Sequence, residues 1–256
     1  MSAVPPRILV TTSRGKPVRE YLEAIREAGG DPQIVEPGDP ARALLDDAAG
    51  VLLTGGVDVD PASYGASTSA FVTESEPERD VMEIDLLRAA RERALPTLCI
   101  CRGLQIANVA FGGTLLDDVP HRLGAAATVR HDVLTADGRS ERGLIAEHVV
   151  AVDPGSLLHT IVGTARLVTG ARHHQAVDRP SGELRVAGRT PDGIVEVLEA
   201  AFASPFWLAV QWHPESTREL DGGASRALFS AFVRAAVRRC VRPGEASGGA
   251  RSATPR

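Results

Sequence analysis

A cysteine and a histidine–glutamate pair, far apart in the sequence, are the side chains whose types and spacing best fit a chemical reaction. Cys101 lies in the stretch Thr97–Gln105, where an apolar run meets the start of a helix-like segment. Gly103 follows two residues later, which fits the strand–turn–helix elbow that presents a nucleophile. The helix N-terminus and a nearby imidazolium would lower the thiol pKa and favour the thiolate. The alternative is a small buried hydrophobic residue, which is common for free cysteines.

His213 and Glu215, two residues apart in Gln211–Glu215, offer a base and the carboxylate that would orient it. At a strand end, residues i and i+2 face the same side, so Glu215 is expected to hold one ring nitrogen while the other faces the thiol. Pro214 biases His213 toward extended geometry. His213 alone would suggest a surface histidine. Combined with Cys101, the pair predicts a cysteine hydrolase with a Cys–His–Glu triad.

The first half of the chain alternates apolar runs with amphipathic segments, which predicts strands and helices in turn. We expect strands at Arg7–Thr12, Gln33–Glu36, Gly50–Thr54 and Pro96–Ile100. We expect helices at Pro17–Gly29, Ala41–Ala48, Arg79–Ala94 and Gly103–Phe111. This alternation favours a parallel sheet with helices on both faces, where ligands bind at the carboxyl ends of the strands. Gly55, Gly56 and Cys101 all lie at such ends.

The second half predicts further strands, partly antiparallel, at Thr128–Val133, His148–Val152, Leu184–Arg189, Ile194–Leu198 and Trp207–Gln211. A final amphipathic helix is expected at Ala224–Val241. Glycine, serine, alanine and proline dominate the residues after it. We therefore expect one domain, residues 1–242, and a disordered tail, residues 243–256.

The composition is that of an ordinary globular protein, with 43% hydrophobic and 24% charged residues among 256. A net charge of -5 argues against nucleic acid or an anionic membrane as the main partner. No apolar run reaches the roughly 18 residues that span a bilayer, and Met1–Thr12 lacks the long apolar stretch of an export signal. Three cysteines do not suggest a disulfide framework. We expect a cytoplasmic enzyme that acts on a small molecule.

Several separated motifs resemble those of the class I glutamine amidotransferase-like superfamily, and within it the branch of γ-glutamyl hydrolases that act on γ-glutamyl-γ-aminobutyrate. The resemblance covers roughly Arg7 to Val241. It implies a flavodoxin-like three-layer α/β sandwich with a mostly parallel central sheet and a few extra antiparallel strands. It also implies that Cys101, His213 and Glu215 form the triad. The motifs that carry it are Cys101–Gln105, Trp212–Glu215, Leu53–Pro61, Arg79–Asp80 with Glu83, Asn108 with Gly112–Leu115, His173–Val177 and Asp192–Glu196.

The resemblance assigns further residues to the site. Backbone N–H groups of Gly56 and Arg102 would bind the developing oxyanion. Without the family, the Gly55–Gly56 pair would suggest a plain turn after a strand. Substrate contacts are expected from Gly55, Gln105, His173, His174 and Gln175. Adjacent side chains on a strand face opposite ways, so at most one ring of the His173–His174 pair should reach the site.

No metal or organic cofactor is expected. Asp58 and Asp60 lack the ligand count of a calcium loop and are expected in a structured loop. The other histidines show no metal-ligand spacing and are expected to be structural: His121, His131, His148 and His159.

The chain departs from the family pattern at two places. Cys99 stands where relatives usually have glycine, and Thr169–Arg172 stands where they often carry an Asn-Ser pair. A Cys99–Cys101 disulfide would be strained at this spacing. Cys240 has no expected partner.

The sequence thus predicts hydrolysis of a γ-glutamyl amide through a thioester, most simply of γ-glutamyl-γ-aminobutyrate in putrescine catabolism. Three alternatives stay open. They are a glutaminase subunit that supplies ammonia to a synthase in trans, a hydrolase of folate polyglutamates, and a catalytically silent regulatory protein on the same fold. The amine leaving group, the use of free glutamine and assembly as a homodimer are also left open.

Overall fold

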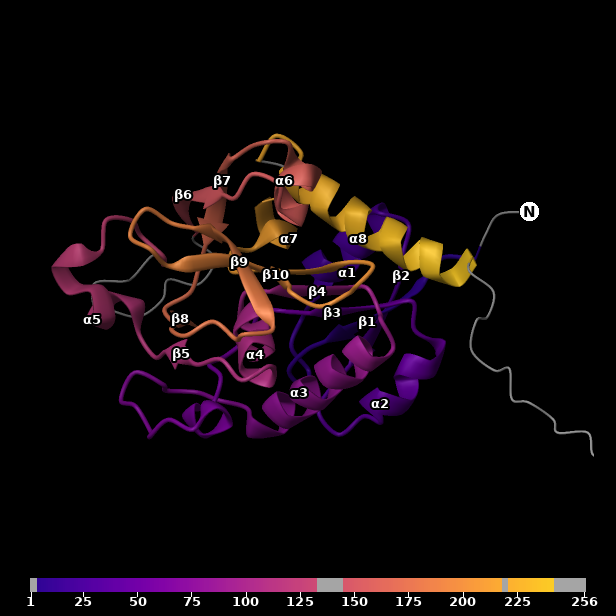
Figure 1. Cartoon of the computed structure of the whole chain (residues 1–256). Coiled ribbons are helices and arrows are strands. Elements are labelled where there is room, and N and C mark those ends of the chain that lie inside the picture. Colours follow the sequence, from indigo (N-terminus) through magenta and orange to yellow (C-terminus); the bar gives the residue numbers. More distant parts are fainter. Residues whose placement is uncertain (1–3, 133–144, 218–220, 242–256) are drawn as a thin grey trace, which may run out of the picture.

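A nine-stranded sheet forms the centre of the computed structural model, which describes residues 4–132, 145–217 and 221–241. Its strand order is β2-β1-β3-β4-β11-β10-β9-β6-β7 (Figure 1). The predicted tail after residue 242 lies outside the described residues.

The first part of the sheet is parallel and has the strand order of doubly wound folds. It contains β1 (Arg7–Thr11), β2 (Asp31–Val35), β3 (Gly50–Leu53), β4 (Thr97–Ile100) and β11 (Trp207–Val210). The connecting helices are α1 (Arg19–Glu27), α2 (Ala41–Leu44), α3 (Pro77–Glu92) and α4 (Arg102–Ala110). Leu53 pairs with Cys99, and Val210 pairs with Ile100, so the carboxyl ends of β3, β4 and β11 lie at one edge. The expected strands and helices of this half are confirmed within a few residues.

The second part of the sheet is antiparallel, as predicted for the second half of the chain. It adds β10 (Val195–Ala200), β9 (Leu184–Arg189), β6 (Ala146–Val152) and β7 (Arg166–Ala171). A separate small sheet pairs β5 (Leu115–Leu116) with β8 (Ala176–Val177). The flavodoxin-like α/β fold is therefore confirmed.

Two details of the second half differ from the sequence prediction. Thr128–Asp132 is irregular rather than a strand, because His131 is held by tertiary contacts with Asp192 and His173 instead of a strand ladder. The sequence did not predict a strand at β7, because exposed positions interrupt its apolar pattern. Pairing with β6 makes this segment a strand.

Two hydrophobic layers cover the sheet. Ile8 and Val10 face α1 and α8 (Ala224–Val241), and Leu9 faces the side of α2, α3 and α4. This alternation is the period-two pattern of a strand buried on both faces. Figure 1 shows α8 on one side of the sheet and α2 and α3 on the other. Cys99 and Cys101 belong to opposite layers, so the two sulfurs have different surroundings.

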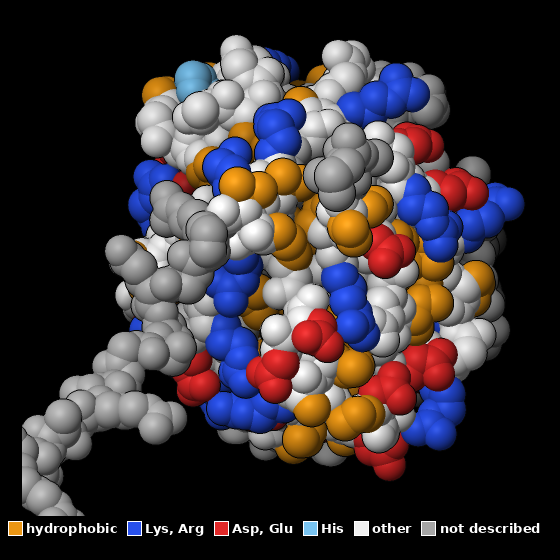
Figure 2. All heavy atoms as spheres, turned by 90° about the vertical axis from the view of Figure 1, so that its right-hand side faces the viewer, with side chains coloured by type: hydrophobic (Ala, Val, Ile, Leu, Met, Phe, Trp, Pro, Cys, Tyr) orange, Lys and Arg blue, Asp and Glu red, His pale blue; other side chains and the backbone are white. Residues whose placement is uncertain are grey.

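The remaining helices are short: α5 (Val119–Leu123), α6 (Leu157–Val162) and α7 (Pro214–Thr217), with 3-10 turns at Leu45–Asp47, Pro61–Tyr64 and Gly124–Ala126. Within the described ranges, none of the helices is both long and apolar enough to cross a membrane. On the face drawn in Figure 2, basic, acidic and hydrophobic side chains are intermixed.

Candidate active site

Cys101 occupies a strained turn between β4 and α4. Its φ of 54° and ψ of -107° lie in a region that residues other than glycine rarely adopt. The strain is held by neighbouring hydrogen bonds, because the Cys101 N–H donates to Val210 O at 2.8 Å and its carbonyl accepts from Leu104 N at 2.9 Å. A Cβ at Gly103 would lie 2.6 Å from the carbonyl oxygen of Leu53. The elbow predicted from the sequence is therefore present, and it needs a residue without a side chain at position 103.

His213 and Glu215 lie next to this elbow, in a geometry that differs from the expected one. They do not extend β11, because Pro214 opens α7 and Glu215 is the second residue of that helix. Proline is well suited to a first helical turn, where its missing N–H costs nothing. His213 Nδ1 and Glu215 Oε1 are 2.6 Å apart, and both residues are buried. The carboxylate therefore fixes the ring, which leaves Nε2 for the sulfur.

The electrostatics of this pair favour a charged imidazole. Burial of the His213 ring opposes its protonation, but the charges of Glu215 and Cys101 and hydrogen bonds with both outweigh this and raise the pKa of His213 to about 10. An imidazolium at neutral pH is the form that stabilises a neighbouring thiolate. The site therefore has the charge arrangement that an activated cysteine requires.

Tyr21 of α1 links the base to the glycine turn after β3. Its hydroxyl accepts a hydrogen bond from Gly55 N at 3.1 Å and lies 3.4 Å from His213 Nδ1. Burial raises the pKa of Tyr21, so the phenol keeps its proton. A Cβ at Gly55 would lie 2.9 Å from the His213 ring and 3.0 Å from the Tyr21 hydroxyl. Gly55 thus leaves room for the His213 ring and the Tyr21 hydroxyl. The sequence pattern did not indicate the contact of Tyr21 with the site.

A cavity of about 820 Å³ opens at this edge of the sheet. Cys101, His213 and all of the residues expected to bind substrate or oxyanion line it: Gly55, Gly56, Arg102, Gln105, His173, His174 and Gln175. Lys16 and Arg172 also line the cavity. The structure therefore brings the predicted residues together around one space, to which Lys16 and Arg172 add two further cationic residues.

A buried ion-pair cluster lies behind the glycine turn. Arg79 Nε donates to Glu83 Oε1 at 2.9 Å, and the other end of the guanidinium donates to the carbonyl oxygens of Thr54 and Gly55, each at 3.2 Å. Arg102 pairs with both Glu83 and Asp80. A Cβ at Gly56 would lie 2.2 Å from Arg79 Nη1. The cluster therefore connects α3 to both turns where the oxyanion is expected to bind.

The charges within the cluster balance. Burial alone would raise the pKa of Glu83, but the positive charges of Arg79 and Arg102 outweigh it and lower that pKa. Asp80 also accepts hydrogen bonds from Asp60 N at 2.9 Å and Ser63 Oγ at 3.0 Å. These contacts extend the cluster to the loop after the glycine turn. The sequence singled out Arg79, Asp80 and Glu83 as a family motif without giving them a role.

The three polar residues Gln105, Gln175 and Gln211 connect the floor of the cavity. Gln105 Nε2 donates to Gln175 O at 3.0 Å and to Gln211 Oε1 at 3.3 Å. Gln211 Nε2 lies 3.6 Å from the Cys101 sulfur. Gln175 Oε1 accepts from Val59 N at 3.0 Å, while its buried Nε2 has no hydrogen-bond partner among the described residues. Gln175 therefore has a donor available for a bound molecule.

The two adjacent histidines have different environments. They follow β7 in an irregular segment rather than a strand, so both His173 and His174 border the cavity. The His174 ring lies 2.7 Å from Asp58 and 3.3 Å from Asp118, and these carboxylates outweigh burial and raise the pKa of His174. The His173 ring is directed toward Glu196, 3.3 Å away. The loop role expected for Asp58 is consistent with its contact to His174.

A second cluster of potential ligands lies beside the cavity. Within the described residues, His131, His148 and Glu196 form a group whose ligand atoms are all within 4.8 Å of one another. Their spacing in the sequence gave no sign of this proximity. Asp58 and Asp60 are not part of that group.

Several known proteins are similar to this chain. The profile of the Peptidase C26 family matches residues 9–215. A candidate glutamine amidotransferase of Mycobacterium tuberculosis, Rv2859c, is 37% identical over 222 residues, which cover 85% of this chain and 66% of the relative. The γ-glutamyl-γ-aminobutyrate hydrolase PuuD of Escherichia coli is 34% identical over 226 residues, which cover 84% of each chain.

A search of solved structures supports the fold. The chain is similar to a candidate GMP synthase component from Thermoplasma acidophilum, with a TM-score of 0.65 and 17% identity. The match covers 93% of this chain and 96% of that structure.

Proposed function

Because the chain belongs to the peptidase C26 family, within the class I glutamine amidotransferase-like proteins, we propose that it is a cysteine hydrolase that cleaves a γ-glutamyl amide. The observation that carries the proposal is the strained Cys101 at the start of α4, beside a buried His213–Glu215 pair that opens on the same cavity.

The reaction begins with attack of the Cys101 thiolate on the γ-carbonyl carbon. The oxyanion that forms is stabilised by the backbone N–H groups of Gly56 and Arg102; Arg102 begins α4, where an N–H has no partner within the helix. The C–N bond then breaks, and the His213 imidazolium gives its proton to the departing amine. A γ-glutamyl thioester and a neutral imidazole remain.

Water completes the cycle. His213 takes a proton from water, and the resulting hydroxide attacks the thioester carbonyl. The C–S bond breaks, glutamate leaves and the thiolate is regenerated beside the imidazolium. Glu215 keeps the His213 ring in place and compensates its charge throughout.

The leaving amine that we favour is γ-aminobutyrate. An E. coli relative at 34% identity carries the name of that activity. The substrate has two carboxylates, and Lys16 and Arg172 line the cavity. These cations would pair with carboxylates at the α-carbon or on the leaving group.

Supply of ammonia from glutamine to a synthase partner is the second candidate, because a relative at 37% identity is described as an amidotransferase. A panel of γ-glutamyl amides that includes glutamine, with released glutamate measured by mass spectrometry, separates the two. A preference for γ-glutamyl-γ-aminobutyrate of about tenfold or more in kcat/KM, worth about 1.4 kcal/mol, is expected. Equal or better turnover of glutamine, increased by a synthase, would favour the second candidate.

Labelling tests the chemistry independently of the substrate. A glutamine-like diazoketone should add one equivalent to the wild type, and peptide mass spectrometry should place it on Cys101. Cys101→Ser should lose both the label and hydrolysis, while Cys240→Ser, which changes an exposed thiol, should keep both. Label on another residue, or hydrolysis retained by Cys101→Ser, would refute the proposal.

A further inference from the structure

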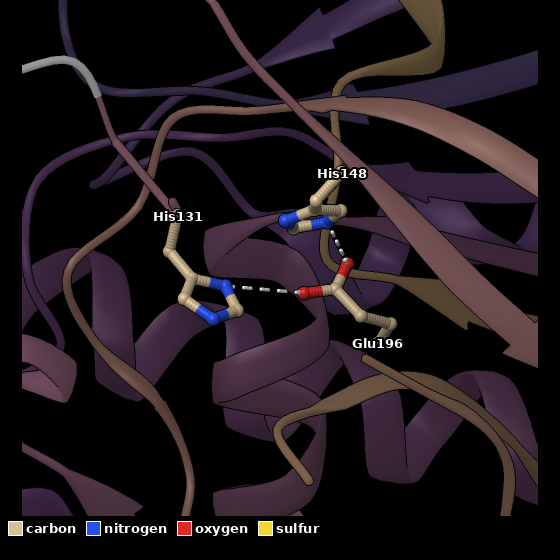
Figure 3. A group of neighbouring side chains, drawn as sticks. All are labelled: His131, His148 and Glu196. Carbon is tan, nitrogen blue, oxygen red and sulfur yellow. Dashed lines mark ion pairs between the residues drawn. The ribbon is translucent and has the colours of Figure 1, made fainter. Parts of the chain in front are cut away.

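Three histidines and one glutamate converge in the antiparallel half of the protein, beside the active site. His148 belongs to β6 and Glu196 to β10, while His131 and His173 come from irregular segments. All four residues are buried. Figure 3 shows the rings of His131 and His148 pointing at the carboxylate of Glu196 from two sides. The proposed reaction uses none of these side chains.

In each of the three rings, one nitrogen faces Glu196 (the inner nitrogen) and the other faces away from it (the outer nitrogen). Each outer nitrogen already has a hydrogen-bond acceptor. His131 Nε2 lies 3.2 Å from Asp192 Oδ2, His148 Nδ1 lies 3.1 Å from Arg130 O, and His173 Nδ1 lies 2.9 Å from Gln175 O. Carboxylates and carbonyls only accept hydrogen bonds, so each outer nitrogen carries a hydrogen. In the neutral rings, the inner nitrogens therefore present lone pairs.

The inner atoms are all without hydrogen-bond partners among the described residues. They are His131 Nδ1, His148 Nε2, His173 Nε2 and both oxygens of Glu196. Buried polar groups are rarely left in this state, because each unmade hydrogen bond costs about 1–3 kcal/mol. Such atoms are satisfied either by protons, which give imidazolium–carboxylate pairs, or by a metal cation.

The ligand atoms of His131, His148 and Glu196 all lie within 4.8 Å of one another, which is close to the spacing around one small ion. His131 Nδ1 and His173 Nε2 lie 3.8 and 3.3 Å from Glu196 Oε1, and His148 Nε2 lies 3.4 Å from Oε2. Tetrahedral Zn²⁺, with metal–ligand bonds of about 2.0–2.2 Å, separates its ligands by about 3.3–3.6 Å. The contacts of the outer nitrogens with a carboxylate and with carbonyls are those that orient zinc-bound histidines. His131 also borders a surface hollow of about 350 Å³.

We propose that His131 Nδ1, His148 Nε2 and the Glu196 carboxylate bind a divalent transition metal, with Zn²⁺ favoured by the donor set. The ion would connect β6 and β10 to His131, whose carbonyl accepts a hydrogen bond from His173 N at 2.9 Å. Because His173 and Gln175 line the cavity, the metal stabilises one wall of the active site without taking part in the reaction.

Metal content of the full-length, tag-free chain tests the proposal. The triad cysteine is itself a zinc ligand by type, so the measurements are made in a Cys101→Ala background. After chelator treatment, one equivalent of Zn²⁺ is added, the protein is passed through gel filtration, and bound zinc is measured by mass spectrometry. We expect one equivalent bound, and a melting temperature about 5 °C or more above that of the chelated protein.

Two variants and a control assign the site. His148→Gln and Glu196→Gln should lose the stoichiometric zinc and its thermal shift, while His159→Gln, a histidine of α6 outside the cluster, should keep both. Co²⁺ in place of Zn²⁺ should give the intense visible absorption of a tetrahedral site in the parent protein, a readout that does not depend on how well any variant folds.

Other results would overturn the proposal. Zinc that binds to the wild type but is lost in Cys101→Ala would place the ion at the triad. Zinc retained by both cluster variants would place it elsewhere. Absence of bound zinc, with no thermal shift in the parent, would mean that protons alone satisfy the cluster. The labelling of Cys101 tests the proposed hydrolase reaction separately from these measurements.

Discussion

Cys101 is reactive by position rather than by residue type. Cys99, two residues earlier, is fully buried on the opposite layer, and burial raises the pKa of its thiol. The positive φ at Cys101 turns its side chain toward His213 and away from the Cys99 layer. Both cysteines are free. The Cys99 thiol is therefore neutral and packed, whereas the Cys101 sulfur lies beside the imidazolium of His213.

Replacing Glu215 with glutamine should separate positioning from charge. The amide retains the shape of the side chain, but the His213 pKa should fall from about 10, because Glu215 is its strongest source of stabilising charge. We expect kcat/KM for γ-glutamyl amide hydrolysis to fall by about 10²–10⁴. Steady-state kinetics and an NMR titration of the His213 ring measure the two effects. A Glu92→Gln control on the exposed face of α3 should change neither.

The same substitution should change how stability depends on pH. The pKa of His213 is raised in the fold, from an ordinary 6.5 to about 10. The contribution of His213 to the free energy of unfolding is therefore complete below about pH 6.5 and is lost as the pH rises through 10. The free energy of unfolding of the wild type, measured with urea, should decline over that range. The free energy of unfolding of the Glu215→Gln variant should decline less. Parallel curves for the two proteins would contradict the assignment.

At the scale of elements, α3 connects the turns that form the site. Its Arg79 and Glu83 contact the carbonyls after β3 and the first residue of α4. The elbow at Cys101 and the turn at Gly55 are thus fixed by one helix. Neither hydrophobic period nor turn preference in the sequence carries information about such a contact, since it joins three separate segments.

Glu83→Gln should destabilise the protein by about 3–5 kcal/mol, because it leaves two buried guanidinium groups with one remaining carboxylate. Its matched control is Asp85→Asn on the same helix, which removes a half-exposed pair with Arg42 and should cost about 1 kcal/mol or less. Urea unfolding measures both. Equal effects of the two substitutions would show that the buried cluster is not needed for stability.

At the scale of the whole molecule, one sheet runs through the parallel and antiparallel halves. β11 pairs with β4 on one side and with β10 on the other, so the halves share strands and hydrophobic layers. This continuity supports a single domain, which stays a prediction together with the assembly state and the location in the cell.

Unfolding should therefore be one cooperative transition. We expect far-UV circular dichroism and the fluorescence of the buried Trp207 and Trp212 to change together in urea, with chelator present so that metal binding does not separate the halves. Two resolved transitions would show that the halves unfold independently, and the chain would then be better described as two units.

The sequence by itself determined the strand and helix order of the parallel half, the elbow at Cys101 and the partnership with His213 and Glu215. The element order follows from short-range periods, and the elbow and the His213–Glu215 pair follow from residues close together in the chain. Their partnership with Cys101 follows from the residue types that a cysteine hydrolase combines. Only the tertiary structure decided that Tyr21, Arg79 and Glu83 support the site, and that Pro214 starts a helix that holds Glu215. It also decided that His131, His148, His173 and Glu196 meet. The physical reason is tertiary packing: helices, irregular segments and strands β6 and β10, which are separated by β9 in the sheet, bring together residues whose separation in the sequence has no period.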